Sequence, residues 1–115
     1  MRHLEDDLQI SCVRYFGLAF PKLAAFLHHS PNGGKRNVRE AARFKKMGTK
    51  SGFADLFLMI PKNKFAGMFI ELKSPKGKQT DNQKEFEANA KSAGYEYCVC
   101  RSFEEFQETI NNYLN

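Results

Sequence analysis

The sequence feature that most constrains the fold is a pair of apolar segments that each carry one carboxylate. Asp55 stands directly before the apolar run of residues 56–60 (LFLMI), and Glu71 lies near the end of residues 67–73 (GMFIELK). Apolar runs of this kind predict central strands, and the intervening PKNK predicts a hairpin turn. An ionised carboxylate on a central strand costs free energy unless it is paired or binds a metal ion. The two acids therefore indicate a functional site on an antiparallel hairpin.

Whether the acids meet depends on the pairing register of this hairpin. In an antiparallel pair the numbers of opposed residues have a constant sum. A sum of 126 places Asp55 opposite Glu71, and a sum of 128 places it opposite Lys73. Lys73 shares a face with Glu71 because side chains alternate along a strand, whereas an odd sum would move Asp55 to the other face. The loop length permits either an even or an odd sum, and we predict an even one.

The rest of the chain predicts helices and strands around this hairpin. Helices are expected near residues 4–16, 35–47, 80–94 and 103–114, and further strands at 24–29 and 95–101. This order predicts an α/β domain in which helices flank a mixed central sheet. The 115 residues contain no linker or repeat, which fits a single domain over residues 1–115. The apolar stripe of the last helix (Phe103, Phe106, Ile110, Tyr113) is expected to pack in the core rather than to form a dimer interface.

Two neighbouring carboxylates suit a hard divalent cation with oxygen ligands. Mg²⁺ is the first choice, because it binds one or two carboxylates, keeps water ligands and accepts phosphate oxygens. A lysine ammonium beside such an ion can orient water and stabilise developing negative charge. A cross-strand ion pair between Lys73 and the acids is the simpler alternative.

The distribution of charge favours a polyanionic partner. The net charge is +5, and residues 33–84 carry thirteen basic and four acidic side chains. Helical spacing gathers part of this charge on one face, and the expected contacts to the phosphate backbone are Lys35, Arg36, Arg39, Arg43, Lys46 and Lys50. Basic side chains far outnumber aromatic ones in this stretch, so duplex backbone contacts are expected rather than base stacking. A solvated basic surface is the alternative.

Three cysteines, an odd number, argue against a disulfide framework and favour a reducing compartment. No apolar run approaches the roughly 18–20 residues that a membrane span needs. The first residues, MRHLEDDLQ, carry acids where a signal peptide would have its apolar stretch. We therefore expect a cytoplasmic protein that is neither secreted nor bound to a membrane.

Several motifs together resemble a known family. GFAD at residues 52–55 followed by IELK at 70–73 resembles the core of the PD-(D/E)xK nuclease superfamily, with Ala54 in place of its proline. Within it, the chain is similar to a stand-alone VRR-NUC domain (virus-type replication–repair nuclease). The matching stretches are HHSPNGGKR at 28–36, KKMGTKSGFAD at 45–55, TDNQ at 80–83, the Glu5-x-x-x-Gln9 helix, and Gly94-Tyr95.

The resemblance implies a restriction-endonuclease-like core and a role for individual residues. Asp55, Glu71 and the backbone carbonyl of Leu72 would bind Mg²⁺ or Mn²⁺, and Lys73 would be the catalytic lysine. Glu5 would approach the metal directly or through water. The helix-borne glutamine would be Gln83, which also fits a capping box with Thr80, and both roles can hold. Further candidates near the site or the phosphate are Gln9, His29 and Asn32.

The implied function is that of a metal-dependent, structure-selective DNA endonuclease of phage or bacterial replication, repair or recombination. A symmetric homodimer would present two active sites and could cut a four-way (Holliday) junction on paired strands. A flap or nicking nuclease, an RNA-directed nuclease and a non-catalytic DNA-binding module are the alternatives.

Overall fold

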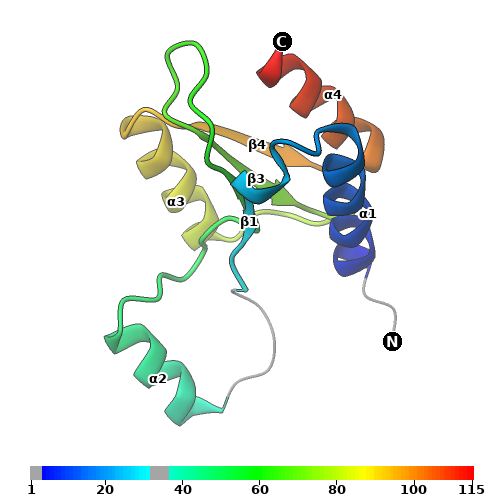
Figure 1. Ribbon diagram of the computed structural model, residues 1–115. Coiled ribbons are helices and arrows are strands. Elements are labelled where there is room, and N and C mark those ends of the chain that lie inside the picture. Colours follow the sequence, from blue (N-terminus) through cyan, green and yellow to red (C-terminus); the bar gives the residue numbers. More distant parts are fainter. Residues whose placement is uncertain (1–3, 32–36) are drawn as a thin grey trace.

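The computed structural model describes residues 4–31 and 37–115 and shows a mixed four-stranded sheet between helices (Figure 1). The strands are β1 (Leu27–His29), β2 (Leu56–Leu58), β3 (Met68–Leu72) and β4 (Glu96–Cys100), in that spatial order. The helices are α1 (Leu4–Ala19), α2 (Val38–Lys46), α3 (Asp81–Ser92) and α4 (Phe103–Leu114), and a 3₁₀ turn, η1 (Ala24–Phe26), precedes β1. The predicted α/β class and element order are confirmed.

The connections explain the mixed sheet. β1, β2 and β3 pair antiparallel, and β4 pairs parallel with β3. Parallel pairing requires a crossover, which α3 supplies. In Figure 1, α3 covers one face of the sheet, and α1 and α4 cover the other.

Alternation along β3 divides the core between these two faces. Met68, Ile70 and Leu72 are buried on the face of α1 and α4, together with Phe106 and Ile110 from α4. Phe69 is buried on the α3 face in a second, aromatic cluster with Tyr97, Phe53, Phe57 and Phe86. The apolar stripe of α4 therefore packs in the core, as predicted. Glu71 follows the alternation of Phe69 and so belongs to the α3 face.

The hairpin has the predicted even register. Leu56 pairs with Ile70 and Leu58 with Met68, which corresponds to a sum of 126. Continuation of this register places Asp55 opposite Glu71.

β2 is shorter than the predicted strand over residues 56–60, and its burial alternates. Leu56 and Leu58 are buried, Phe57 is half-buried, and Met59 is 53% exposed. Pairing with β3 ends at Leu58 and Met68, and the N–H of Met59 donates to the carbonyl of Phe26 instead. The turn then closes through a bridge between Lys62 and Phe65.

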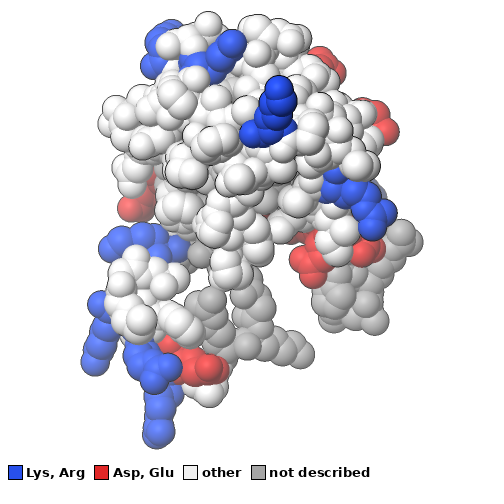
Figure 2. All heavy atoms as spheres, viewed as in Figure 1, with Lys and Arg blue, Asp and Glu red and all other residues white. Residues whose placement is uncertain are grey.

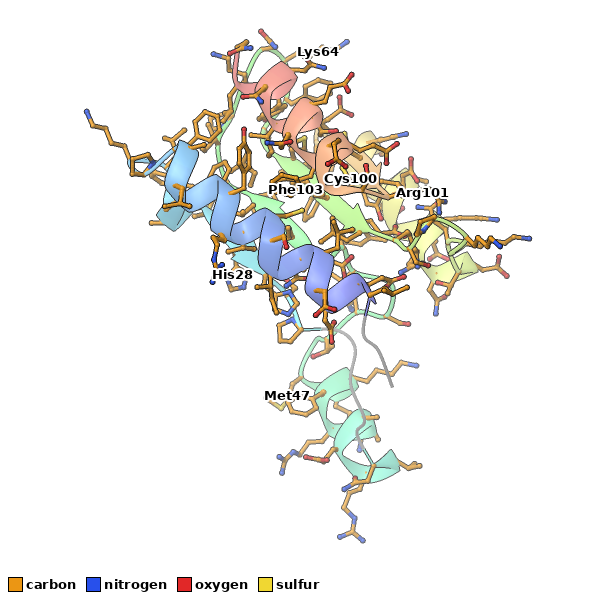
Figure 3. All side chains as sticks on the ribbon, turned by 90° about the vertical axis from the view of Figure 1, so that its right-hand side faces the viewer. His28, Met47, Lys64, Cys100, Arg101 and Phe103 are labelled. Atoms are coloured by element: carbon orange, nitrogen blue, oxygen red, sulfur yellow. The ribbon has the colours of Figure 1, made fainter. Side chains whose placement is uncertain are left out.

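The second helix differs most from the prediction. It begins at Val38 rather than near residue 35, with Asn37 as its N-cap, and Gly48 at φ +109 ends it. Val38, Ala41 and Ala42 share one apolar stripe by helical spacing, yet all three are exposed, Val38 by 87%. No residue of α2 is buried. Figure 3 shows the helix extending away from the rest of the molecule, with Met47 near its end.

Among the remaining local predictions, the capping box is confirmed and the strand over residues 24–26 is wrong. Thr80 and Gln83 form the capping box of α3, and Ser102 caps α4. Residues 24–26, predicted as strand, form η1 instead. The three cysteines are free thiols. Within residues 4–31 and 37–115, no helix is long and apolar enough to cross a membrane.

Candidate active site

Asp55, Glu71 and Lys73 meet at one end of the hairpin, on the sheet face that α3 covers. Glu71 is 1% exposed and Lys73 is 8% exposed, so a full ion pair is held inside the protein. Lys73 Nζ lies 3.4 Å from Glu71 Oε2. Asp55 is half-buried and connects this pair to the surface.

Asp55 is held by its neighbours on both sides. Its Oδ2 accepts a 2.7 Å hydrogen bond from the N–H of Leu72. Its carbonyl oxygen accepts from the N–H of Ser30 and lies 3.0 Å from Nδ1 of His29. His29 thus contacts the backbone of Asp55, as the sequence allowed, while its role in the reaction stays a prediction.

The environment of Asp55 disfavours its charge. Burial raises the pKa of this carboxyl group, and the negative charges of Glu71 and Glu5 raise it further. The hydrogen bond from Leu72 and the charge of Lys73 act in the opposite direction. A cation at this position would therefore relieve a real electrostatic cost.

The two oxygens of Glu71 have different surroundings. Oε1 accepts hydrogen bonds from the hydroxyl of Tyr97 and from Nε2 of Gln79, the latter at 3.1 Å. Oε2 is fully buried without a hydrogen-bond donor, and its described polar neighbour is the ammonium of Lys73. A buried carboxylate oxygen without a donor is rare in proteins. It marks a position where a cation would complete the site.

The donor set fits a hard divalent cation. Asp55 and Glu71 supply carboxylate oxygens, which Mg²⁺ and Mn²⁺ prefer over softer ligands. Among the described residues, no three His, Cys, Asp or Glu side chains are close enough to form a metal cluster. Asp55 and Glu71 would be the side-chain ligands of such an ion, and Mg²⁺ characteristically completes a set of this kind with water and substrate oxygens.

Glu5 lies beside this pair without joining it. Its Oε2 accepts a 3.2 Å hydrogen bond from the N–H of Ser74, the residue after Lys73. A direct metal contact is therefore less consistent with the structure than one through water, the second arrangement that the resemblance allowed. Gln9, one helical turn later on α1, is half-buried.

Three residues of this region did not stand out in the sequence. Tyr97 and Gln79 hold Glu71, and Arg101 holds the loop after Lys73 by donating from Nη1 to the carbonyls of Ser74 and Gly77. The sequence pointed only weakly to Tyr97 as a functional residue, because its hydroxyl is a polar group on a predicted strand. Its contact with Glu71 depends on the pairing of β3 with β4, which no local pattern reveals.

Gln83 adopts the capping role. Its Oε1 accepts from the N–H of Thr80 at 2.8 Å, and Thr80 Oγ1 accepts from the N–H of Gln83. The loop that leads to Asp55 packs on this helix end, where a Cβ on Gly52 would come within 2.5 Å of the Asn82 carbonyl. The catalytic role predicted for Gln83 stays a prediction.

The basic residues predicted to contact phosphates lie mainly on the protruding helix. Figure 2 shows Lys and Arg side chains gathered on α2, across from carboxylates at the start of α1. Arg39, Arg43 and Lys46 are exposed on α2, and Lys50 is exposed in the loop that follows. Lys35, Arg36 and Asn32 lie outside the described residues.

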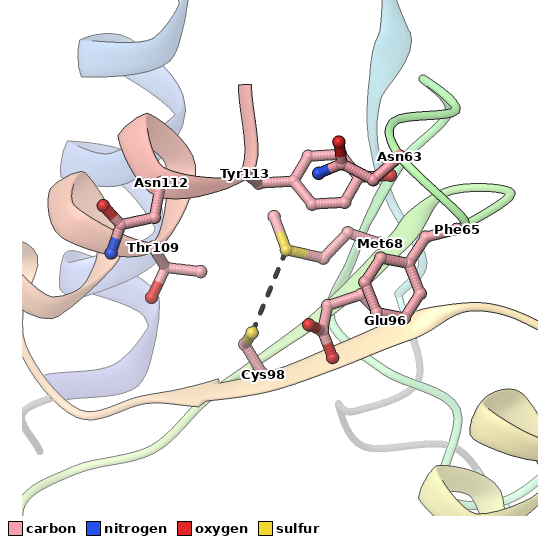
Figure 4. A pocket seen from close by; sticks show the side chains of 8 residues that line it. All are labelled: Asn63, Phe65, Met68, Glu96, Cys98, Thr109, Asn112 and Tyr113. Atoms are coloured by element: carbon pink, nitrogen blue, oxygen red, sulfur yellow. Dashed lines mark hydrogen bonds between the residues drawn. The ribbon is translucent and has the colours of Figure 1, made fainter. Parts of the chain in front are cut away.

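A hollow of about 260 Å³ lies away from this site (Figure 4). It is lined by residues of β4, α4 and the hairpin turn, among them Glu96, Tyr113 and Phe65. Inside it, the Cys98 thiol lies 3.9 Å from the sulfur of Met68. Met68 and Glu96 begin β3 and β4, whereas Asp55 and Glu71 lie near the opposite end of the hairpin.

A mixed sheet that carries an Asp and a Glu-x-Lys on one face of an antiparallel hairpin defines a nuclease domain of the PD-(D/E)xK type. The chain belongs to the VRR-NUC domain family, whose model matches residues 7–104. A solved structure described as a VRR_NUC domain protein is similar, with a TM-score of 0.86 and 29% sequence identity. That similarity covers 99% of this chain and 90% of the other. No curated protein matches the chain.

Proposed function

We propose that this protein is a metal-dependent, structure-selective endonuclease that hydrolyses phosphodiester bonds in DNA. The observation that supports this most directly is the meeting of Asp55, Glu71 and Lys73 on one buried face. Two neighbouring carboxylates can hold a divalent cation, and an ammonium beside them can stabilise the charge that develops during phosphodiester hydrolysis.

Asp55 and Glu71 would hold Mg²⁺ or Mn²⁺, together with the backbone carbonyl of Leu72. Glu5 would take part through water. A bound divalent cation lowers the pKa of water and stabilises the negative charge that develops on an attacked phosphodiester.

Lys73 would act on the attacking water and on the phosphate. Burial and the 3.4 Å contact with Glu71 Oε2 hold its ammonium next to the acid pair. A fixed ammonium in a site with little water stabilises developing negative charge more strongly than an exposed one, because solvent screens it less. The cross-strand ion pair considered as the simpler alternative is present, but it leaves the second acid, Asp55, unexplained.

DNA would approach from the side of α2. Arg39, Arg43 and Lys46 extend from a helix that buries none of its own residues, so they are free to follow a phosphate backbone. Lys50 continues this surface toward the loop that carries Asp55. Phe44 is the one aromatic side chain of α2, and it is half-buried, so these basic residues favour contacts to duplex backbone and recognition by shape over base stacking.

Within this class, the leading substrate is a four-way DNA junction cut by a homodimer. Two copies related by a two-fold axis would place two active sites on symmetric strands. The apolar stripe of α4 is used in the core, so the dimer would form through another surface. A flap or nicking nuclease is the second candidate, and it requires no dimer.

Cleavage of a labelled four-way junction beside a linear duplex of the same sequence tests the proposal. The reactions contain Mg²⁺, Mn²⁺ or EDTA, and Lys73→Ala is the control variant. We expect symmetric cuts in the junction that require a metal and are lost in the variant.

Other outcomes separate the alternatives. Equal cutting of both DNAs would retain the nuclease and remove the junction substrate. A flap substrate cut in preference to the junction would identify the second candidate. Binding without cleavage under any metal would overturn the enzymatic proposal in favour of a DNA-binding module.

A further inference from the structure

One oxygen of each carboxylate in the acid pair accepts hydrogen bonds from protein donors. Asp55 Oδ2 accepts from Leu72, and Glu71 Oε1 accepts from Tyr97 and Gln79. Among the described residues, no hydrogen-bond donor reaches Glu71 Oε2. Glu71 is therefore available to a ligand through its Oε2.

The two donors to Glu71 are themselves held in place. Tyr97 is 5% exposed and pairs with Phe69 on the α3 face, where its ring packs against Phe86. Gln79 Nε2 also donates to Glu87 Oε1 at 2.9 Å, and Glu87 pairs with Lys91 at 2.7 Å. Releasing Oε1 would break two hydrogen bonds at a buried charged group, each of which is costly to leave unmade.

Divalent cations differ in whether they bind a carboxylate through one of its oxygens or through both. Ca²⁺ takes six to eight oxygens in flexible geometry and commonly binds a carboxylate through both of them. Mg²⁺ requires near-octahedral geometry with six ligands, and Mn²⁺ shares the octahedral oxygen preference. A carboxylate confined to one oxygen therefore penalises Ca²⁺ and leaves the smaller ions unaffected.

We propose that Tyr97 and Gln79 are positioning residues that confine Glu71 to one-oxygen coordination and so make the site select Mg²⁺ or Mn²⁺ over Ca²⁺. The inference rests on the proposed metal site and adds to it the residues that determine metal selectivity. Neither residue needs to contact the ion or the DNA.

The test is cation binding to the full chain without DNA. Mn²⁺ binding is followed by electron paramagnetic resonance, and Mg²⁺ and Ca²⁺ compete for it, in the wild type, Tyr97→Phe, Gln79→Leu and the double variant. Tyr113→Phe is the matched control, because Tyr113 is also a buried tyrosine whose hydroxyl donates to one acceptor, the carbonyl of Ile60. We expect the Ca²⁺ affinity relative to Mg²⁺ to rise roughly tenfold in the double variant, the size of one hydrogen bond to a charged group. The control should retain the wild-type ratio.

Three results would count against the inference in different ways. A ratio that changes by less than about twofold while Mn²⁺ still binds would overturn the selectivity role and leave the metal site intact. A rise of the Ca²⁺-to-Mg²⁺ affinity ratio in Tyr113→Phe as large as that in the double variant would identify a general effect of lost stability. Wild-type protein that binds no Mn²⁺ would overturn the metal site itself. If Tyr97→Phe does not fold, Gln79→Leu decides alone, because Gln79 lies on a partly exposed loop.

Discussion

The backbone N–H of Leu72 donates a 2.7 Å hydrogen bond to the side chain of Asp55. The bond lies beyond Leu56 and Ile70, the last residue pair of β2 and β3 at this end. The side chain of Asp55, a candidate catalytic residue, is thus positioned by the backbone of β3. The bond also connects the two acids, because Leu72 follows Glu71 directly. Glu71 lies within β3 and Asp55 directly precedes β2, so both acids are anchored to the sheet, which favours a precise geometry.

Asp55→Asn should stabilise the metal-free protein at neutral pH while abolishing cleavage. Burial raises the pKa of Asp55, and the Glu71 and Glu5 carboxylates add to the shift. An acid with a raised pKa contributes stability below its unfolded pKa, and that contribution is lost as the pH rises through its folded pKa. The urea midpoint of Asp55→Asn in EDTA should thus exceed that of the wild type at pH 8. The difference between the two urea midpoints should become smaller as the pH falls toward the usual pKa of aspartate, about 3.9.

Asp7→Asn provides the matched control for this prediction. Asp7 is exposed in the first turn of α1, where a negative charge interacts favourably with the helix dipole. Its replacement should lower stability slightly, by about 0.3–1 kcal/mol. If Asp55→Asn behaved like Asp7→Asn, the acid pair would carry no electrostatic cost.

Lys73→Met should reduce both cleavage and stability. Loss of one fixed charge-stabilising group lowers a cleavage rate by about 10²–10³-fold. The variant also leaves Glu71 buried without its counter-ion, which costs about 3–5 kcal/mol in the free energy of unfolding. Mg²⁺ should recover part of this loss, since a cation would again pair with Glu71. Cleavage at the wild-type rate would exclude Lys73 from catalysis. Lys84→Met is the control, because Lys84 is exposed.

The triple variant Arg39→Ala, Arg43→Ala, Lys46→Ala should weaken DNA binding without affecting folding. Each lost phosphate contact lowers the slope of log K against log salt by about 0.9, so the slope should fall by about 2–3. The unfolding midpoint and the cleavage rate at saturating DNA should stay unchanged, because α2 buries no residue.

A double variant, Lys62→Ala with Lys64→Ala, is the control for charge alone. Both lysines lie in or beside the hairpin turn, at the other end of the molecule from α2 (Figure 3 labels Lys64). An equal loss of affinity in this control would show that α2 is not the DNA interface.

Gln83→Glu separates capping from catalysis. Glutamate also serves at the third position of a capping box, so stability should be unchanged. The variant loses the Nε2 donor, and we expect the cleavage rate to fall about tenfold or more if that donor contacts a phosphate. Thr80→Ala should do the reverse, with a loss of about 1 kcal/mol in stability and an unchanged rate. Full activity in Gln83→Glu would leave Gln83 as a cap only.

Local patterns predicted most of the helices and strands, and they singled out the three charged residues that the structure brings together. The capping box at Thr80 and the apolar stripe of α4 depend on neighbours within one or two helical turns, which a sequence displays directly. Asp55, Glu71 and Lys73 stood out because charged residues on central strands need a reason to be there.

The same kind of reasoning failed for α2. Val38 belongs to an apolar stripe by helical spacing, yet it is 87% exposed, because no other element of the described chain covers that side of the helix. A periodic pattern reports which side chains share a face, and it does not report whether anything packs against that face.

The sequence by itself determined which residues could form the site, and the tertiary structure decided which of them meet. The hairpin loop permitted both parities, and the burial of opposite faces against α3 and against α1 with α4 selected the even register, since a one-residue slip would exchange both faces. Tyr97 and Gln79 reach Glu71 only through the parallel pairing of β4 and the path of the loop before α3. Such contacts depend on long-range packing of strands, whose free energy is shared over the whole core and is not encoded at any one position.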